Sequence, residues 1–449
     1  MNSTTNYQSL VAFRDQIYNA FTRAEDALMN TADALMTETQ AQSLPELSLS
    51  PHFERRWHSL YEAFEDGVIQ KGLLRHAFAQ ATPLPQNGRI VLGTDASSIA
   101  RPKSKTARDR TLVHESNLPD GCPPVVAGWQ FSTLALLPES PSTEKCPEGI
   151  FLRWTYTLDN TRIRSDQKAA DVAAQQLRQS LGLLPPCPDL RPLLVADGYY
   201  CCLSFLLATR DIPCDKLVRL AKNRLLYRVA PQRTGKRGRP QKHGPLFQPS
   251  DPTTHQEADG CFQGERIQVS SWEGLHFREA PDLLVSVVRV TRELATDSKR
   301  DPRVSWFLFV GECLPPLSDI PALYARRYSI EHAYRVDKQD LLWERVHLRT
   351  PEQFERWTDI VACVRNQLVL ARHLSCVRQP WERESREATP SQVRRGMRRI
   401  LPQLGTPARL CQPRGKSPGR VLGSQVTRAE RFPVLRKSPK MVKKNHTLV

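Results

Sequence analysis

The chain has 449 residues, 40% of them hydrophobic, which is enough to bury a large core and to form an enzyme-sized body of two or three parts. Its formal net charge is +17 at pH 7 and its pI is about 9.6, so we expect a polyanionic partner. No apolar run approaches the ~20 residues of a membrane span, and the opening MNSTTNYQSL lacks a signal-peptide pattern, which argues against a membrane protein and predicts a soluble, cytoplasmic one.

The first 85 residues are predicted to be helical. They contain 6 basic and 10 acidic residues, so their charge does not favour DNA binding. Residues 10–36 show a helical pattern without Gly or Pro, and Ser50-Pro51 is typical of the start of a helix that runs through Trp57 and Phe64. A further helix is expected near 69–78. We interpret these helices as packing on the core or on a second protomer; contact of Arg55 and Arg56 with DNA is the alternative.

From about residue 88 the pattern changes to strands separated by helices. RIVLGTDASS, PPVVAGWQFSTLALLP and IFLRWTYTL read as strands, and DQKAADVAAQQLRQSLG reads as a helix closed by Gly182. The strand LRPLLVADGYY and the helix CCLSFLLATRD follow. This order predicts an α/β sheet in which Asp95 and Asp197 end two strands. Aspartates also end strands simply as turn formers, so each alone is weak support for a site.

A basic loop and three more strands follow. The loop QRTGKRGRPQKHG contains Arg237-Gly238-Arg239, which is similar to an AT-hook, where a flat Arg-Gly-Arg lies in a narrow minor groove. A solvated loop that touches phosphates non-specifically is the alternative. The strands are ERIQVSSWEGLHF, DLLVSVVRVTR and VSWFLFVG.

The stretch YARRYSIEHAYRVDK carries four polar residues at a spacing that makes one stripe on a helix. At 100° per residue, Tyr324, Arg327, Glu331 and Lys338 fall within an arc of about 60°. Apolar positions such as Ile330 lie beside this arc, so the stripe borders the buried face instead of lying opposite it. A carboxylate there, flanked by cations, suits Mg²⁺-dependent phosphodiester chemistry. A solvated face is the alternative reading.

The last part of the chain is strongly basic. Residues 380–449 hold 17 Lys and Arg against 4 acidic residues, most of the excess positive charge of the whole chain. The Pro, Gly and Lys/Arg content, as in CQPRGKSPGR, predicts a mobile arm from Arg394 onward that faces nucleic acid. The eleven cysteines include no C-x-x-C pair and the histidines no paired spacing, so zinc is not expected.

The spacing Y-x2-R-x3-E-x6-K resembles the signature of a large group of bacterial insertion-sequence transposases with an Asp-Asp-Glu triad. GTDASSIARP is similar to their first-aspartate region and LLVADGYY to the second, although Ala96-Ser97-Ser98 departs from the residues that often follow the first aspartate. The resemblance extends from RRWHSLYEAFEDG to PRGKSPGR, nearly the whole chain.

This resemblance implies an α/β protein whose RNase H-like catalytic core is interrupted by a β-rich insertion, with an N-terminal helical region and a basic C-terminal tail. The implied parts are the helical region (1–85), the first part of the core with both aspartates (86–222), the insertion with the basic loop (223–303), the second part of the core with the catalytic glutamate (304–378) and the tail (379–449).

The resemblance also implies the residues of the site. Asp95, Asp197 and Glu331 would be the catalytic residues and hold two Mg²⁺ ions, for which Mn²⁺ can substitute. The implied DNA contacts are Tyr324, Arg327, Lys338 and Trp306, and the AT-hook-like loop adds Arg237 and Arg239 as further candidates. In hairpin-forming transposases an insertion-domain tryptophan stacks on a base flipped out beside the cleavage site. Trp272 competes with Trp306 for this role, and a plain core position is the alternative for both.

The implied function is transposition. The protein would bind the terminal inverted repeats of its insertion sequence, cleave the DNA at the element ends and join the 3′-OH ends to target DNA, acting as a homodimer on double-stranded DNA near the bacterial nucleoid. Two alternatives remain open. One is an RNase H-like nuclease such as a junction resolvase, and the other is a non-catalytic repressor derived from a transposase.

Overall fold

The computed structural model describes most of the chain, from residue 3 to residue 436 with gaps. The described residues are 3–85, 89–115, 124–138, 154–185, 191–221, 224–231, 241–248, 256–293, 303–382, 388–412, 421–425 and 427–436. The basic loop with Arg237 and Arg239 lies outside them. None of the helices in the described residues is both long and apolar enough to cross a lipid bilayer.

A mixed sheet forms the centre of the molecule. Strand β3 (Val91–Ala100) pairs in parallel with β7 (Leu193–Ala196), and β7 pairs in parallel with β8 (Asp215–Arg219). On its other side β3 pairs antiparallel with the long β5 (Val125–Leu136), which in turn pairs with β4 and β6. The bounds of these last two strands are Thr111–His114 and Tyr156–Ile163. The fold is therefore mixed α/β, and the strands of Asp95 and Asp197 are neighbours, as the sequence pattern predicted. The prediction that Asp95 ends its strand is wrong, because β3 continues in register with β5 to Ala100.

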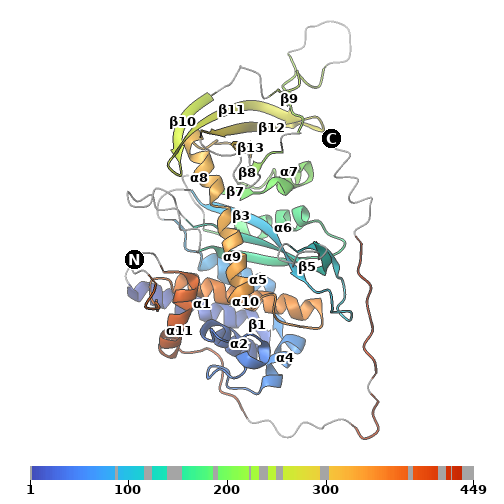
Figure 1. Ribbon diagram of the computed structural model, residues 1–449, viewed down its shortest axis with the longest axis vertical. Coiled ribbons are helices and arrows are strands. Elements are labelled where there is room, and N and C mark those ends of the chain that lie inside the picture. The colour runs from blue at the N-terminus through green and yellow to red at the C-terminus, as the bar shows by residue number, and fades with distance from the viewer. Residues whose placement is uncertain are drawn as a thin grey trace.

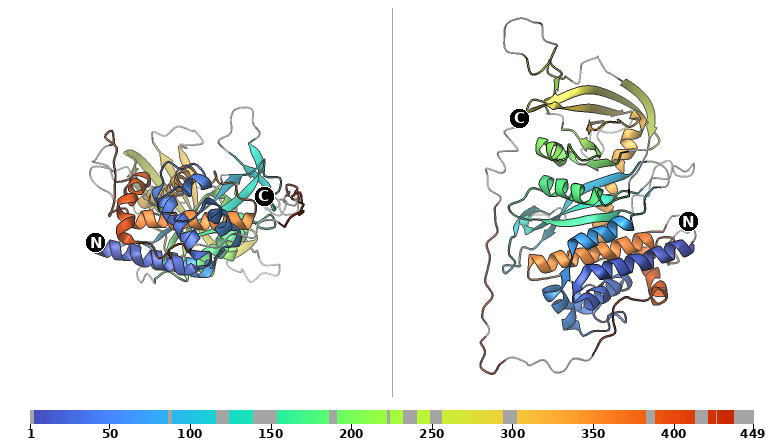
Figure 2. Two further views of the ribbon diagram at one scale, coloured as in Figure 1. Left: turned by 90° about the horizontal axis from the view of Figure 1, so that it is seen from below. Right: turned by 180° about the vertical axis from the view of Figure 1, so that it is seen from behind.

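Helices cover both faces of this sheet. Helices α6 (Ala169–Leu181) and α7 (Leu203–Ala208) lie on one face, and α8 (Ile320–Ala325) and α9 (Tyr328–Gln339) run along the other (Figures 1 and 2). A glycine lets α9 come close to β3: a Cβ atom at Gly93 would lie 2.7 Å from Cδ1 of Ile330. This close approach holds α9 over the part of β3 that carries Asp95.

A β-rich segment follows β8 along the chain and continues the central sheet. It is a meander in which each strand pairs antiparallel with the next, and its last strand, β13, pairs antiparallel with β8 of the core. The short β9 (Tyr227–Arg228) pairs with β11. The meander strands are β10 (Gln256–Phe262), β11 (Glu265–Phe277), β12 (Ala280–Arg292) and β13 (Val304–Val310). The three strands expected from sequence match β11, β12 and β13, and the result is one sheet of eleven strands.

The N-terminal region is a helical body that packs around the long helix α10 (Pro351–Leu370) (Figure 1). The single helical pattern expected over 10–36 is broken by β1, and Ala24 has a positive φ of 54° before the next helix begins. The start expected at Pro51 is also wrong, because that helix begins at Trp57. The elements of this body are α1 (Ser3–Ala20), β1 (Phe21–Arg23), α2 (Glu25–Thr37), α3 (Leu44–Leu47), α4 (Trp57–Asp66), β2 (Val68–Ile69) and α5 (Lys71–Gln80).

Buried polar contacts tie this body together. Arg14 of α1 is 1% exposed and donates hydrogen bonds of 2.7 Å to Asp33 Oδ1 and to Gln367 Oε1 of α10. Arg55 donates to Asn30 and pairs with Asp26 at 3.6 Å, so its guanidinium is engaged within the protein. The contacts fit the interpretation that these helices pack on the core.

The strongly basic C-terminal segment begins as an ordered helix, α11 (Pro390–Leu404). Arg394 is 3% exposed and donates to the backbone oxygens of Leu35, Glu38 and Asp340. The expectation of a mobile arm from Arg394 onward is therefore wrong for this helix. Further on, Leu435 forms a parallel bridge with Thr111 at the edge of the sheet, and the described residues 427–434 before it lie along the outside of the molecule (Figure 2).

Candidate active site

Three carboxylates from separate elements approach one another where α9 crosses the sheet. Asp95 lies in the middle of β3, Asp197 directly follows β7, and Glu331 is in the first turn of α9. Gly93 pairs with Val195, and each aspartate comes two residues after its member of this pair. Asp95 and Asp197 therefore lie side by side on the two neighbouring chain segments. Tyr199 N–H donates to Asp197 Oδ1 at 3.0 Å, so Asp197 caps the short 3₁₀ turn that ends the strand.

The environment of Asp95 disfavours its charged form. Burial raises the pKa of Asp95 to about 6, and the negative charges of Asp197 and Glu331 act in the same direction. The cation of Arg327 and a 2.8 Å hydrogen bond from the N–H of Ala96 oppose this increase. The three carboxylates are thus close enough to influence one another, and a bound cation would reduce the repulsion between their negative charges.

Arg327 bridges two of these carboxylates. Its Nη2 donates to Glu331 Oε1 at 2.8 Å, and its Nη1 lies 3.8 Å from Asp95 Oδ2. Burial alone would lower the pKa of Arg327, but Tyr324, Asp95 and Glu331 hold it above its usual value. The guanidinium therefore neutralises part of the negative charge at this point.

The donor set fits a hard divalent cation, since carboxylate oxygens are the ligands that Mg²⁺ and Mn²⁺ prefer. Among the residues that the structure describes, no three acidic, imidazole or thiol side chains are close enough to hold a metal ion as they stand. The side chain of Glu331 is 50% exposed, so it has room to turn toward the aspartates once Arg327 releases it.

The pKa of Asp95 predicts a pH dependence. In the folded protein Asp95 holds its proton up to about pH 6, whereas in the unfolded chain it loses it near pH 4, so its contribution to stability falls as the pH rises through this window. Asp95→Asn is therefore expected to raise the free energy of unfolding by about 2 kcal/mol at pH 7.5 without metal, and the gain should disappear near pH 4. Urea unfolding in EDTA at both pH values measures it; an equal effect at both would contradict the assignment.

Helix α9 is fixed in place by polar contacts as well as by packing. The hydroxyl of Tyr334 donates to the backbone oxygen of Asp95 at 3.0 Å, and Lys338 Nζ donates to the backbone oxygen of Ser98 at 2.9 Å. At the preceding position, Asp337 forms a buried ion pair with Arg365 of α10. Lys338 thus lies beside β3 beyond the carboxylates, where it also pairs with Glu344 at 3.3 Å.

The polar stripe is not one continuous helix. Helix α8 ends at Ala325, and Arg327 is the N-cap of α9, so Tyr324 belongs to a separate short helix. Tyr324 is 6% exposed and packs on Phe307 of β13, with ring centroids 4.6 Å apart. The structure therefore brings Arg327 and Glu331 together at the carboxylates, whereas Lys338 and Tyr324 lie at the two sides of this cluster.

Sequence reasoning did not single out Arg219, the last residue of β8. The strand register places it beside the position of Asp197 and opposite Phe307, and its positive charge acts on Tyr324. Arg219 is half-buried, and no acidic partner for it is present among the described residues. Its position became visible only through the pairing of β8 with β13, for which the sequence carries no local signal.

The two candidate tryptophans have different environments. Trp272 is fully buried and packs edge-on against Phe247, so its ring is inaccessible to a base. Trp306 is half-buried and stacks on Trp272, with ring centroids 5.8 Å apart and 26° between the planes. Because Phe307 faces α8, its neighbour Trp306 points to the opposite face of the sheet. Trp306 is nevertheless near the end of the sheet at which Asp197 lies. Its carbonyl accepts the N–H of Leu220 at 2.9 Å, and Leu220 directly follows β8, the neighbour of β7.

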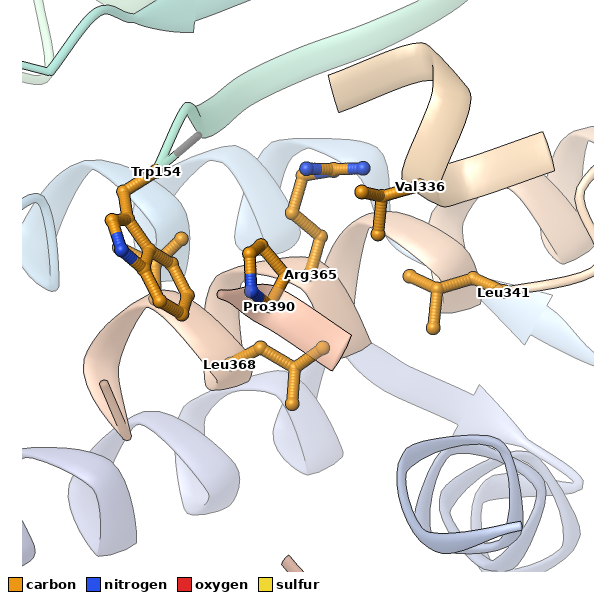
Figure 3. Close-up of a pocket in the computed structure, with 7 residues that line it drawn as sticks. Trp154, Val336, Leu341, Arg365, Leu368 and Pro390 are labelled. Atoms are coloured by element: carbon orange, nitrogen blue, oxygen red, sulfur yellow. The ribbon is translucent and has the colours of Figure 1, made fainter. Parts of the chain in front are cut away.

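The small cavity shown in Figure 3 is separate from the carboxylates. It lies between α9, α10 and the start of α11, and its volume of about 10 Å³ is enough for no more than one water. Its lining residues are Trp154, Val336, Leu341, Arg365, Leu368, Val369 and Pro390. It is a packing gap and not a substrate site.

A protein-family profile described as DDE superfamily endonuclease matches residues 15–278, more than half of the chain. The chain belongs to this family. The matched range includes Asp95 and Asp197 and ends before Glu331. Members of the DDE superfamily generally use divalent metal ions, which agrees with the donor set described above.

Two further comparisons add little to this assignment. No curated protein matches the sequence. Among solved structures, the chain is similar to a cryo-EM structure of piggyBac transposase in a synaptic complex with hairpin DNA, with 9% identity, a TM-score of 0.43 and coverage of 88% of this chain and 78% of that one. A likeness this distant carries no argument about fold or activity.

Proposed function

We propose that this DDE superfamily endonuclease is a transposase that cuts DNA at the ends of an insertion sequence and joins the freed 3′-OH ends to target DNA. The observation that carries the proposal is the approach of Asp95, Asp197 and Glu331 to one another around Arg327. The net charge of +17 supports a nucleic-acid partner. The order of β4, β5, β3, β7 and β8 in the sheet supports an RNase H-like core.

We propose that the five parts inferred from sequence have separate roles. The core parts at 86–222 and 304–378 supply the carboxylates, and the insertion at 223–303 contacts the DNA end. The helical region at 1–85 and the basic segment at 379–449 flank the core, although α11 packs with the helical region. Two element ends need two active sites, so we expect a homodimer on DNA.

The chemistry needs water to attack the phosphodiester at the element end, which releases a 3′-OH, and then that hydroxyl to attack a phosphodiester of the target. One phosphodiester replaces another in the joining step, so no outside energy source is needed. Asp95, Asp197 and Glu331 would hold two divalent ions, which supply charge stabilisation for the attacking and leaving oxygens. The chain's own part is to fix these carboxylates on β3, β7 and α9 and to position the DNA phosphates.

Three cationic residues are proposed to contact DNA phosphates around the carboxylates, and Tyr324 to orient one of them. Arg327 would exchange its contacts with Glu331 and Asp95 for a phosphate, which frees both carboxylates for metal. Lys338 would bind a phosphate beside β3. Arg219 lies on the other side of the cluster, and Tyr324, packed on Phe307, would orient Arg327, whose guanidinium carbon is 6.0 Å from the tyrosine ring.

The basic loop is proposed to reach the DNA outside the active site through Arg237 and Arg239. Replacing both by alanine is expected to weaken DNA binding and to reduce the slope of log affinity against log salt by about two, because two phosphate or groove contacts are lost. Fluorescence anisotropy over a salt series measures both quantities. The matched control replaces two exposed arginines elsewhere, Arg278 and Arg399; an unchanged slope in the loop variant would remove this loop from the interface.

The proposal is tested by incubating the protein with Mg²⁺ and a duplex that carries the DNA flanking its coding sequence. Cleavage at the inverted-repeat end and covalent joining of the 3′ end to a second duplex are the expected products. Cleavage of four-way junctions without joining would indicate the nuclease alternative instead. Specific binding with no cleavage in Mg²⁺ or Mn²⁺ would indicate a repressor.

A further inference from the structure

The loop that joins β3 to β4, residues 101–110, is built around a buried arginine. Arg110 is 3% exposed, and its Nη1 donates to the backbone oxygen of Arg101 at 3.1 Å, across the base of the loop. Further along, Trp129 Nε1 donates to the backbone oxygen of Arg108 at 3.0 Å. These contacts fix the path of the loop backbone, so the exposed side chains that it carries start from a fixed frame.

A segment from the C-terminal part of the chain completes this loop from outside. The N–H of Phe432 donates to the backbone oxygen of Lys105 at 2.9 Å, and the carbonyl of Phe432 accepts a 3.1 Å hydrogen bond from Arg110 Nη2. The N–H of Leu435 donates to the backbone oxygen of Arg110 at 2.7 Å. Residues 431–436, which we call the arm, are therefore seated on the loop and on the edge of β4.

The loop and the arm together expose several cations that the protein does not neutralise. The exposed cations are Lys103, Lys105, Arg431 and Arg436. None of the four pairs with an acidic side chain in the part of the chain that the structure describes, and Asp109, the one acidic residue of the loop, is engaged by Arg162. Glu430 directly precedes the arm, which leaves an excess of 4 − 1 = 3 positive charges. This loop–arm surface is suited to a polyanion.

The loop–arm surface and the insertion lie on opposite sides of the carboxylates. In the sheet, β7, β8 and β13 follow β3 on one side, whereas β5 and β4 follow it on the other. Along β3, Ala100 comes five residues after Asp95, a distance of about 17 Å. Lys338, on the backbone oxygen of Ser98, lies between them. A duplex that runs from the carboxylates past Lys338 would reach the loop after about five or six base pairs, at ~3.4 Å each.

We propose that the loop–arm surface binds the phosphate backbone of the flanking duplex, on the far side of the cleaved bond from the insertion. Lys103 and Lys105 bind phosphates from the loop, and the seated arm brings Arg431 and Arg436 to the same duplex. The contact begins about five base pairs beyond the cleaved bond. The inference rests on the proposed action on DNA ends, in which the insertion contacts the end of the element.

Two labelled duplexes test the inference. Both carry the same element end, and they extend beyond the cleaved bond by about three and about twelve base pairs, so that only the longer one can reach the surface. Anisotropy titrations over a NaCl series in EDTA are made with wild type and two variants. Lys103→Ala/Lys105→Ala removes the loop cations. Leu435→Pro keeps every charge but removes the N–H that seats the arm on Arg110.

Each variant has a matched control. Arg278→Ala/Arg399→Ala removes two exposed cations outside the loop–arm surface. Leu422→Pro places a proline in the same C-terminal segment, at an exposed position whose N–H donates no hydrogen bond among the described residues. Leu422 is followed by Gly423 in a turn, where proline is tolerated.

Wild type and both controls are expected to bind the longer duplex more tightly than the shorter one. Lys103→Ala/Lys105→Ala should lose about tenfold in affinity for the longer duplex, with a slope of log affinity against log salt lower by about two, and should bind the shorter one as wild type does. Leu435→Pro should lose part of the same preference although its net charge is unchanged.

Three results would overturn the inference: no preference in wild type, equal losses on both duplexes in the lysine variant, or a Leu435→Pro protein that binds both duplexes as wild type does. Failure of the proposed function would instead appear as absence of cleavage by wild type in Mg²⁺, which these titrations do not measure.

Discussion

An Asp197→Ala protein is expected to bind element-end DNA as wild type does and to cut it at least ~10³-fold more slowly. Asp197 lies directly after β7 and beside Asp95, and each metal ion that these carboxylates are proposed to hold would supply several kcal/mol of charge stabilisation in the transition state. Because 1.36 kcal/mol corresponds to a factor of ten in rate, losing one shared ligand removes at least three orders of magnitude. Single-turnover cleavage of a labelled duplex in Mg²⁺ gives the rate, and anisotropy gives the affinity.

The control for this variant is Asp171→Ala, which removes an exposed carboxylate from α6 on the other face of the sheet. It should cut at the wild-type rate. Mn²⁺ titration in the absence of DNA provides a second readout, since Asp197→Ala should bind the ion more weakly than Asp171→Ala does. An Asp197→Ala protein that still cuts DNA within tenfold of wild type would show that Asp197 is not a metal ligand.

Much of the catalytic region followed from local patterns. Asp95 and Asp197 each follow a short apolar run, and the parallel pairing of these runs places the two carboxylates side by side. The amphipathic spacing around Glu331 correctly predicted a helix whose apolar side, through Ile330, meets the sheet. The stretches that form β11, β12 and β13 were likewise read as strands from their own residues. Each of these features depends on residues close together in the sequence.

The features that were missed depend on distant partners. The break between α8 and α9 occurs within a sequence of good helix formers, and it is accompanied by packing of Tyr324 on Phe307 of β13. The basic character of α11 indicated a mobile arm, yet Arg394 finds three backbone oxygens at the end of α2 and after α9. Composition shows that a segment is basic, but it does not show which oxygen atoms accept hydrogen bonds from its side chains. Such contacts therefore cannot be predicted from the sequence of the segment alone.

The same kind of long-range contact fixes the catalytic helix and gives the second large effect. Asp337→Ala is expected to lower the free energy of unfolding by about 3 to 5 kcal/mol, because it leaves the guanidinium of Arg365 buried without its counter-ion. Asp337 and Arg365 are 6% and 3% exposed, and Arg365 Nε donates to Asp337 Oδ1 at 2.9 Å. Burial raises the pKa of Asp337, so its charge depends on this partner. Urea unfolding at pH 7.5 measures the loss.

The adjoining cavity of about 10 Å³ cannot admit enough water to solvate the donors of Arg365 that Asp337→Ala leaves without an acceptor (Figure 3). The matched control is Asp211→Ala, which breaks the exposed pair between Arg178 and Asp211 and should change the stability far less, because solvent screens an exposed pair.

The double variant Asp337→Leu/Arg365→Met removes both charges together and should recover most of the stability lost in Asp337→Ala, since well-packed apolar side chains can replace a buried ion pair.

The cleavage rate of this double variant then separates two roles of the ion pair. If the pair only neutralises charge, the double variant should cut as fast as wild type. If the pair also sets the position of α9, which carries Tyr334 and Glu331, cleavage should stay slow while stability returns. Tyr334 donates to the backbone oxygen of Asp95, and Glu331 lies about 1.7 turns before Asp337. We expect the second result, because Arg365 also donates to the backbone oxygen of Ala333 and so holds the middle of α9 directly. A double variant that remains as unstable as Asp337→Ala would contradict the assignment of the loss to an uncompensated charge.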